Sequence, residues 1–161
     1  MARDAIARQY DVEKNTVRLI PGTDAPKNYQ SGTITFQAKK GKSINLDKIR
    51  ESIWATRLSG GTNMQVTYLE VTAKGEVVAG EKELLFKIAG TGQQFVLGSG
   101  PNGNEALRRL REAVDRGEKI ASVTGRVNGW SGRFPTVLRD LEAESGKKQL
   151  TLFVTDFATA K

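Results

Sequence analysis

The sequence predicts an α+β protein with two parts: a small N-terminal α/β segment over residues 1–63 and a five-stranded region over residues 64–161. Three observations support this division. Short runs that alternate apolar and polar residues, typical of half-buried strands, recur along the chain. Turns containing glycine separate these runs. One amphipathic segment, residues 105–116, falls between the third and fourth predicted strands of the second part and has the spacing of a helix.

The N-terminal segment is predicted to contain two strands and one helix. Residues 16–20 and 32–38 alternate apolar and polar side chains, as strands do. Residues 46–58 carry apolar side chains at the three- and four-residue spacing of a helix, and Trp54 beside that stripe is expected to pack inward. Between the second strand and the helix, residues 39–42 form a basic turn. Such a turn is usually a solvated loop, and contact with phosphates is the alternative.

The run from Met64 to Val78 organises the second part, because it is the longest stretch of strand-forming side chains. Gly75 interrupts the run, and a lone glycine in a strand indicates a bulge or a sharp bend. Four further strands are predicted over residues 83–88, 93–97, 119–127 and 149–157. Gly117 stands where the helix at residues 105–116 is expected to end. A long excursion, residues 128–148, separates the last two strands.

The composition excludes several classes of function. The chain has no cysteine and no histidine, so disulfides and nucleophilic chemistry by cysteine or a serine–histidine pair are ruled out. Zinc, copper, haem and iron–sulfur sites lose their usual ligands. We therefore expect no cofactor and no transition metal, while a hard cation held by carboxylates stays open.

Catalysis and membrane insertion have little support in the sequence. Without histidine and cysteine, acid–base chemistry falls to carboxylates, lysine or tyrosine. The pairs Glu81/Glu83 and Glu142/Glu144 have no supporting constellation, so we expect that the protein is not an enzyme. No apolar run approaches the ~18 residues that a membrane helix needs, and the start of the sequence shows no signal peptide. We expect a soluble protein whose compartment stays open.

The chain is basic, with a net charge of +7 from 25 basic and 18 acidic residues. Most of the excess lies in the N-terminal part. Residues 1–63 hold 11 basic and 6 acidic residues, a net charge of +5, whereas residues 64–161 hold 14 and 12, a net charge of +2. Such an excess attracts nucleic acids or anionic surfaces, or it serves solubility alone.

The order of elements after Met64 is a long bent strand, two strands, a helix, a strand, a long loop and a last strand. This order resembles an OB-fold, which implies a five-stranded Greek-key barrel with a helix between strands 3 and 4. Members of that family bind ligands through their second and third strands and through the loops joining strands 1–2 and 4–5. The resemblance points to Phe86, Phe95, the turn near Gly80, and a loop with Trp130, Arg133 and Phe134.

Residues 10–58 contain YDVEKNTVRLIPG, GTITFQAKK and LDKIRESIW. Their order of strand, turn, strand and helix resembles the later part of a heavy-metal-associated ferredoxin-like domain. That family holds its metal through a pair of cysteines near its first strand. This chain has no cysteine and no such first strand, so the resemblance implies a related fold without metal transfer.

We interpret the chain as a non-enzymatic binding module for a protein or another ligand, with the loop at residues 129–135 as its best surface. Tryptophan and arginine are enriched at binding hot spots, although Trp130 and Phe134 also suit a role in closing one end of the barrel. The alternative is single-stranded nucleic acid bound by aromatic platforms and basic side chains. The candidate site residues for these readings are Trp130, Arg133, Phe134, Arg126, Lys87, Phe86 and Phe95. The partner and the oligomeric state stay open.

Overall fold

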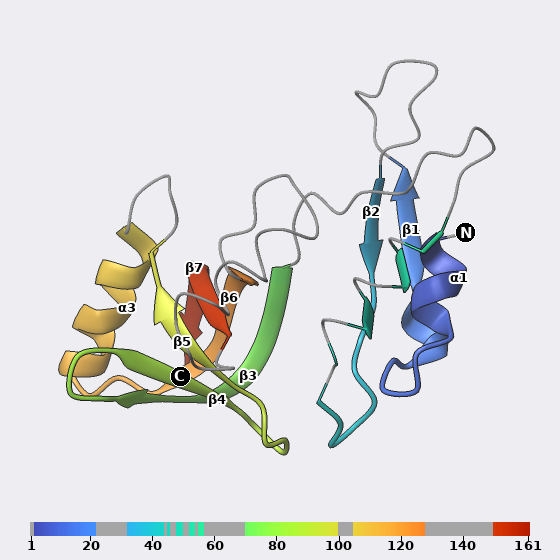
Figure 1. Cartoon of the computed structure of the whole chain (residues 1–161). Coiled ribbons are helices and arrows are strands. Elements are labelled where there is room, and N and C mark those ends of the chain that lie inside the picture. The colour runs from blue at the N-terminus through green and yellow to red at the C-terminus, as the bar shows by residue number, and fades with distance from the viewer. Residues whose placement is uncertain are drawn as a thin grey trace. The chain divides into compact units, whose positions relative to one another are not determined.

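The computed structural model describes residues 2–21, 32–43, 45, 48–49, 52–53, 55–56, 70–99, 105–127 and 150–161 (Figure 1). The chain divides into two compact units, Met1–Gln65 and Val66–Lys161, called here the first and the second unit. The boundary predicted from the sequence, between residues 63 and 64, lies two residues before this division.

The first unit contains α1 (Ala2–Ala7), the 3₁₀ turn η1 (Lys14–Thr16), β1 (Arg18–Pro21) and β2 (Gly32–Thr35). β1 and β2 pair antiparallel, with Leu19 opposite Ile34. Both strands were predicted, and both are shorter than the alternating pattern suggested.

A small core holds the first unit together. Helical backbone at Lys48, Ile49, Ser52 and Ile53 agrees with the helix predicted over residues 46–58, but Ala55 and Thr56 are no longer helical, so the predicted end of this helix is too late. The predicted inward packing of Trp54 lies outside the described residues. The side chains of this core come from α1, the segment before β1, and the helical residues. They are Ala5, Ile6, Val12, Val17, Ile49 and Ile53.

The second unit contains the predicted strands and the helix between the third and the fourth. Its elements are β3 (Glu70–Ala79), β4 (Leu84–Ile88), β5 (Gln94–Gly98), α3 (Glu105–Asp115), β6 (Ile120–Val127) and β7 (Thr151–Thr159). The five strands form one mixed sheet in the order β3-β4-β5-β7-β6. β6 also pairs with β3, so each strand has a neighbour on both sides. β5 and β7 run parallel, and the other neighbours run antiparallel.

β3 joins the two ends of this closed sheet. Its first half, Glu70 to Lys74, pairs with β6, and its second half, Gly75 to Ala79, pairs with β4. Of the two alternatives predicted at Gly75, the structure has the bend: the strand curves as it passes from one partner to the other (Figure 1). It has no bulge there, because the pairing with each partner runs without a shift in register.

Gly75 lies at a close approach between the backbones of β3 and β4. A Cβ atom at this position would lie 2.2 Å from the carbonyl oxygen of Lys87 and 2.8 Å from a ring carbon of Phe86. Real Cβ atoms do not approach a neighbour so closely. The glycine predicted as a break is therefore needed for close packing of backbone on backbone.

The interior of the closed sheet is filled by alternate side chains of its strands. Phe86 of β4 lies opposite Phe95 of β5, and both are completely buried. On β7, Leu152 and Val154 are buried while Thr155 is exposed, which confirms the alternation predicted for the last strand. The remaining buried apolar side chains of the strands are Leu84, Leu97, Ile120, Val123 and Val127.

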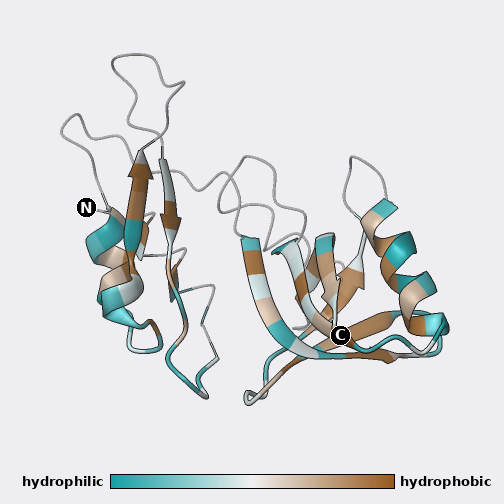
Figure 2. Cartoon of the chain, turned by 180° about the vertical axis from the view of Figure 1, so that it is seen from behind, coloured by the Kyte–Doolittle hydropathy of each residue, from teal (hydrophilic) through white to brown (hydrophobic). Residues whose placement is uncertain are grey.

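α3 buries one face and exposes the other, as its sequence predicts. Leu110 and Ala113 are buried, and the helix changes repeatedly between hydrophobic and hydrophilic side chains along its length (Figure 2). Beyond its last residue, Gly117 has a φ of +76°, and the amide of Glu118 donates to the carbonyl of Ala113 at 2.9 Å. This hydrogen-bonding pattern is that of a helix ended by a left-handed glycine, so the predicted end of the helix is confirmed.

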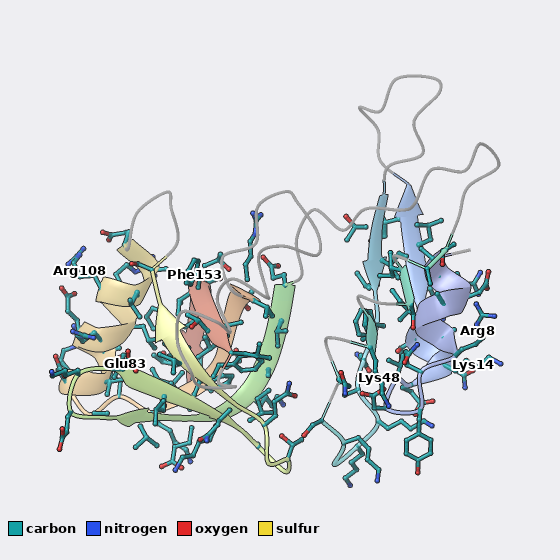
Figure 3. The ribbon with its side chains drawn as sticks, in the orientation of Figure 1. Arg8, Lys14, Lys48, Glu83, Arg108 and Phe153 are labelled. Carbon is teal, nitrogen blue, oxygen red and sulfur yellow. The ribbon has the colours of Figure 1, made fainter. Side chains whose placement is uncertain are left out.

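The exposed face of α3 carries ion pairs within the helix. Arg108 bonds to Glu105 at 2.7 Å and to Glu112 one turn further on, and it lies on the side of the helix away from the strands (Figure 3). Glu105 above all, and then Glu112, raise the pKa of the Arg108 guanidinium above its ordinary value. These pairs are solvated partners on one helix face, and their charges are largely balanced.

Candidate binding surfaces

Phe86 and Phe95 are core residues, not surface platforms. Each has no exposed surface, and the two face each other across adjacent strands inside the closed sheet. A base or a partner side chain cannot stack on a ring that is already enclosed. The hypothesis that these two rings bind a ligand is therefore wrong. Alternation correctly placed Leu84 and Phe86 on one face of β4, but closure of the sheet turned that face inward.

The other proposed site residues fall into two groups. Lys87 on β4 and Arg126 on β6 are exposed, as a binding role requires. Arg126 lies opposite Glu70 in the ladder, and its Nε is 3.9 Å from Glu70 Oε2. The second group, Trp130, Arg133 and Phe134, lies outside the described residues, as does the loop at residues 129–135 to which they belong.

The outer face of the sheet carries a row of three apolar side chains and one threonine that the sequence did not single out. Val78 of β3 lies opposite Leu85 of β4, Leu85 opposite Val96 of β5, and Val96 opposite Thr151 of β7. All four alternate with inward-facing neighbours such as Phe86 and Leu97, so they point outward. Each is partly exposed. We call these four residues the outer row.

Phe153 lies beside the outer row. It is opposite Gly98 on one neighbouring strand and Arg126 on the other. Its ring is close to Gly98, since a Cβ atom there would lie 3.2 Å from Phe153 Cδ1. The ring is partly exposed and lies on β7 where this strand runs next to β5 (Figure 3). Phe153 is therefore an aromatic side chain on the outside of the closed sheet.

Charged and polar residues border the outer row on both sides. On one side Lys87 lies between Glu76 and Gln94 in the ladder. On the other side Arg126 lies opposite Glu70. Each cation thus faces a carboxylate on a neighbouring strand, and the surface is an apolar centre with a charge-balanced border. Buried apolar centres with polar rims are typical of protein–protein interfaces.

An open hollow of about 400 Å³ lies in the second unit where β3 changes partner. Its charged lining residues are Glu76, Lys87 and Lys119. Glu76 and Lys87 belong to the border of the outer row, and Lys119 directly precedes β6. Within the described residues, no three or more acidic, histidine or cysteine side chains come together as metal ligands would.

The sequence predicted that Phe153 lies in the last strand, but not that its side chain faces outward. In the last strand, residues 149–157, both faces carry apolar side chains, so alternation alone does not say which face is the core. The pairing of Leu152 with Leu97, which is itself buried, shows that Phe153 faces outward.

Within the described part of the chain, no helix has the length and apolar character needed to cross a membrane.

In comparisons with known proteins, no protein-family model, no curated protein and no solved structure matches the chain.

Proposed function

We propose that this chain is a non-enzymatic interaction module, that its second unit is an OB-like Greek-key barrel, and that it binds a partner protein through the outer row and Phe153. The OB-like assignment is supported by the closed order of five strands, the helix between the third and fourth strands, and the long curved first strand shared by two partners. The family resemblance places ligands on the outside of the second and third strands, here β4 and β5, which carry Leu85 and Val96.

A single observation supports the binding proposal. Apolar side chains line the outer face of a closed sheet whose inner face holds its own set of buried side chains. Leu152 and Phe86 are completely buried on the inner face, whereas the outer row lies on the opposite face of the same closed sheet. Apolar side chains that adjoin one another across paired strands mark interaction sites more often than isolated ones do. Phe153 supplies a rigid aromatic anchor, and aromatic residues are enriched at interfaces.

The charge balance of this face favours a protein partner over nucleic acid. Single-stranded nucleic acid is bound by a basic groove that follows the phosphates, and such binding weakens steeply with salt. Here Lys87 and Arg126 each lie opposite a glutamate, and residues 64–161 carry a net charge of only +2. Single-stranded nucleic acid on Phe153 and Arg126 is the second candidate, since the two side chains are neighbours in the ladder.

Catalysis is not part of the proposal. The chain has no histidine and no cysteine, and the glutamates considered as an acidic pair, Glu81 and Glu83, are exposed in the connection between β3 and β4. An exposed pair without a neighbouring base or nucleophile lacks the geometry of general acid–base catalysis. Turnover of any substrate by the purified chain would contradict this view.

The test compares partner capture by matched variants in the cells that make the protein. Leu85→Lys places a charge in the centre of the outer row, and Phe153→Ala removes the aromatic anchor. Lys82→Ala, in the exposed connection between β3 and β4, is the control. We expect proteins recovered with the wild type and the control to be lost with both test variants, while circular dichroism shows an unchanged fold.

Two results would contradict the proposal. Recovery of the same proteins in the same amounts by Leu85→Lys and Phe153→Ala would show that this face does not bind them. Salt-sensitive binding of a labelled oligonucleotide that depends on Phe153 and Arg126 would instead favour the second candidate.

A further inference from the structure

Tyr10 is the most exposed large hydrophobic side chain among the described residues, with 77 % of its surface accessible. Two lysines flank its ring. The Nζ of Lys39 lies 4.9 Å from the ring centroid, and the Nζ of Lys42 lies 5.7 Å from it. Both distances are within the range of a cation–π contact. The first unit therefore presents an aromatic ring and two ammonium groups at one place on its surface.

The backbone on both sides of this cluster is fixed. Val12 and Ala38 form a bridge, the amide of Lys39 donates to the Asp11 carbonyl at 2.9 Å, and Val12 is buried. The amide of Lys42 closes the turn by donating to the Lys39 carbonyl at 3.0 Å. The main chain at Tyr10 and at the turn is thus held in register, and only the side chains are free to rearrange.

The turn that flanks the ring carries positive charge only. The turn at residues 39–42 contains three lysines and no acidic residue, and Lys40 is exposed. The nearest carboxylate in the chain sequence, Asp11, accepts a hydrogen bond from the amide of Asn45 at 2.5 Å. The first unit as a whole carries the basic excess, +5 over residues 1–63, and Arg8, Lys14 and Lys48 add further basic side chains on its surface (Figure 3).

We propose that Tyr10, Lys39, Lys40 and Lys42, called here the Tyr10 cluster, bind single-stranded nucleic acid. A base would stack on the Tyr10 ring, and the flexible lysine side chains would move from the ring to the neighbouring phosphates. Aromatic rings and basic side chains in this combination are what sequence-tolerant single-strand binding requires. The proposal is independent of the protein interface on the second unit, because it rests on different residues.

The exposed ring of Tyr10 is the feature that distinguishes a single strand from other anionic ligands of the Tyr10 cluster. A duplex keeps its bases stacked on one another, so it offers phosphates to the lysines but no free base to Tyr10. An anionic lipid surface also offers phosphates without a base. An unstacked base would cover the face of a ring that is 77 % exposed while its phosphates meet the lysines, and this is the reason for preferring the single strand.

The test is a fluorescence anisotropy titration of the full chain with a labelled oligothymidine of about 15 nucleotides, near the upper site size of single-strand binders. It is run at about 50 mM and about 200 mM salt, a range over which the binding of phosphates changes measurably. Tyr10→Ala is expected to weaken binding about 5- to 150-fold, which corresponds to the stacking of one base. Tyr10→Phe keeps the ring and is expected to bind like the wild type.

Removal of the lysines tests the binding of phosphates separately. The double variant Lys39→Ala/Lys42→Ala is expected to reduce the slope of log affinity against log salt by about 1.4, since each phosphate of a single strand that a lysine neutralises adds about 0.7 to that slope. Lys82→Ala, which removes one lysine from a turn of the second unit, is the control and should change neither affinity nor slope. The positions tested are exposed, apart from the partly exposed Lys39, so the fold is expected to persist.

Three outcomes would overturn the proposal: no salt-sensitive binding, equal binding by Tyr10→Ala and the wild type, or binding of a duplex or of anionic vesicles as tightly as the single strand. Leu85→Lys, on the outer row of the second unit, should leave oligonucleotide binding unchanged. The failure of this proposal and the failure of the protein interface are therefore distinguishable.

Discussion

Replacement of Gly75 by alanine should destabilise the second unit, although alanine differs from glycine by one methyl group. The added Cβ would lie 2.2 Å from the carbonyl oxygen of Lys87 and 3.0 Å from its carbonyl carbon. Ordinary contacts between non-bonded heavy atoms are about 3.5–4.0 Å. Both of these atoms belong to the backbone, so a change of side-chain rotamer cannot relieve the clash, and β3 and β4 must move apart by about 1 Å or more.

The size of the effect follows from three contributions. Overpacking that shifts backbone costs about 1–3 kcal/mol. A weakened backbone hydrogen bond next to the site, such as the one from the Ala89 amide to the Lys74 carbonyl at 2.9 Å, costs about 1 kcal/mol. The smaller conformational freedom of alanine in the unfolded chain offsets about 0.4–1 kcal/mol. We expect a net loss of about 2–3 kcal/mol, or a fall in melting temperature of roughly 10–20 °C for a unit of this size.

The assay is urea denaturation followed by circular dichroism, with hydrogen exchange of β4 and β5 to report on the second unit alone. Gly92→Ala is the matched control, because a Cβ atom there meets nothing within 4 Å. It should change stability by less than about 0.5 kcal/mol, as surface substitutions usually do. Equal stability of Gly75→Ala and Gly92→Ala would refute the close approach of β3 and β4.

Two further predictions concern the core and the helix. Phe95→Leu should lower the free energy of unfolding by about 1–2 kcal/mol, because the ring is completely buried, while partner capture by the folded protein should not change; a loss of binding without a loss of stability would restore Phe95 as a surface contact. Arg108→Ala should lower the melting temperature slightly at low salt and not at about 1 M salt, where exposed ion pairs are screened. Since Glu105 and then Glu112 raise the pKa of Arg108, its contribution is present below the unfolded-state pKa and is lost as the pH rises through the folded-state pKa. An Arg108→Ala effect that persists at high salt would mean that the aliphatic part of the side chain, not its charge, stabilises α3.

The sequence was sufficient to predict the described strands and the helix of the second unit, because their signals are local. Strand-forming side chains located β3, and apolar runs between turns located the other four strands of the second unit. The helix α3 was located by the three- and four-residue spacing of Leu107, Leu110, Ala113 and Val114. Gly117 marked the end of that helix through a local requirement for a left-handed backbone. Such signals depend on neighbours in the chain, so no knowledge of the fold was needed to use them.

The candidate site was predicted less well, because it depends on pairing between distant segments. Alternation grouped Phe86 with Leu84 but left open whether that face was inside or outside. The closing pairs of β5 with β7 and of β6 with β3 decide the question, and they turn both phenylalanines inward. The same closure turns Phe153 outward, although its strand is apolar on both faces.

The Tyr10 cluster was missed for a related reason. The sequence presented Tyr10 as part of a polar N-terminal stretch and residues 39–42 as a separate basic turn. The bridge between Val12 and Ala38 brings them together, and the short segments that form it carry little strand periodicity. The spatial arrangement, not either segment alone, combines the aromatic ring with the two ammonium groups.

The claim that the chain binds a protein through the outside of its closed sheet is tested most directly by photocrosslinking at Leu85. A benzoylphenylalanine in place of Leu85 puts the reactive group in the middle of the outer row, between Val78 and Val96. The same group in place of Lys82 is the control. After irradiation in the cells that make the protein, we expect a discrete crosslinked product from position 85 that is absent from position 82 and disappears when Phe153 is also changed to alanine. No product at position 85, or the same products at both positions, would contradict the account.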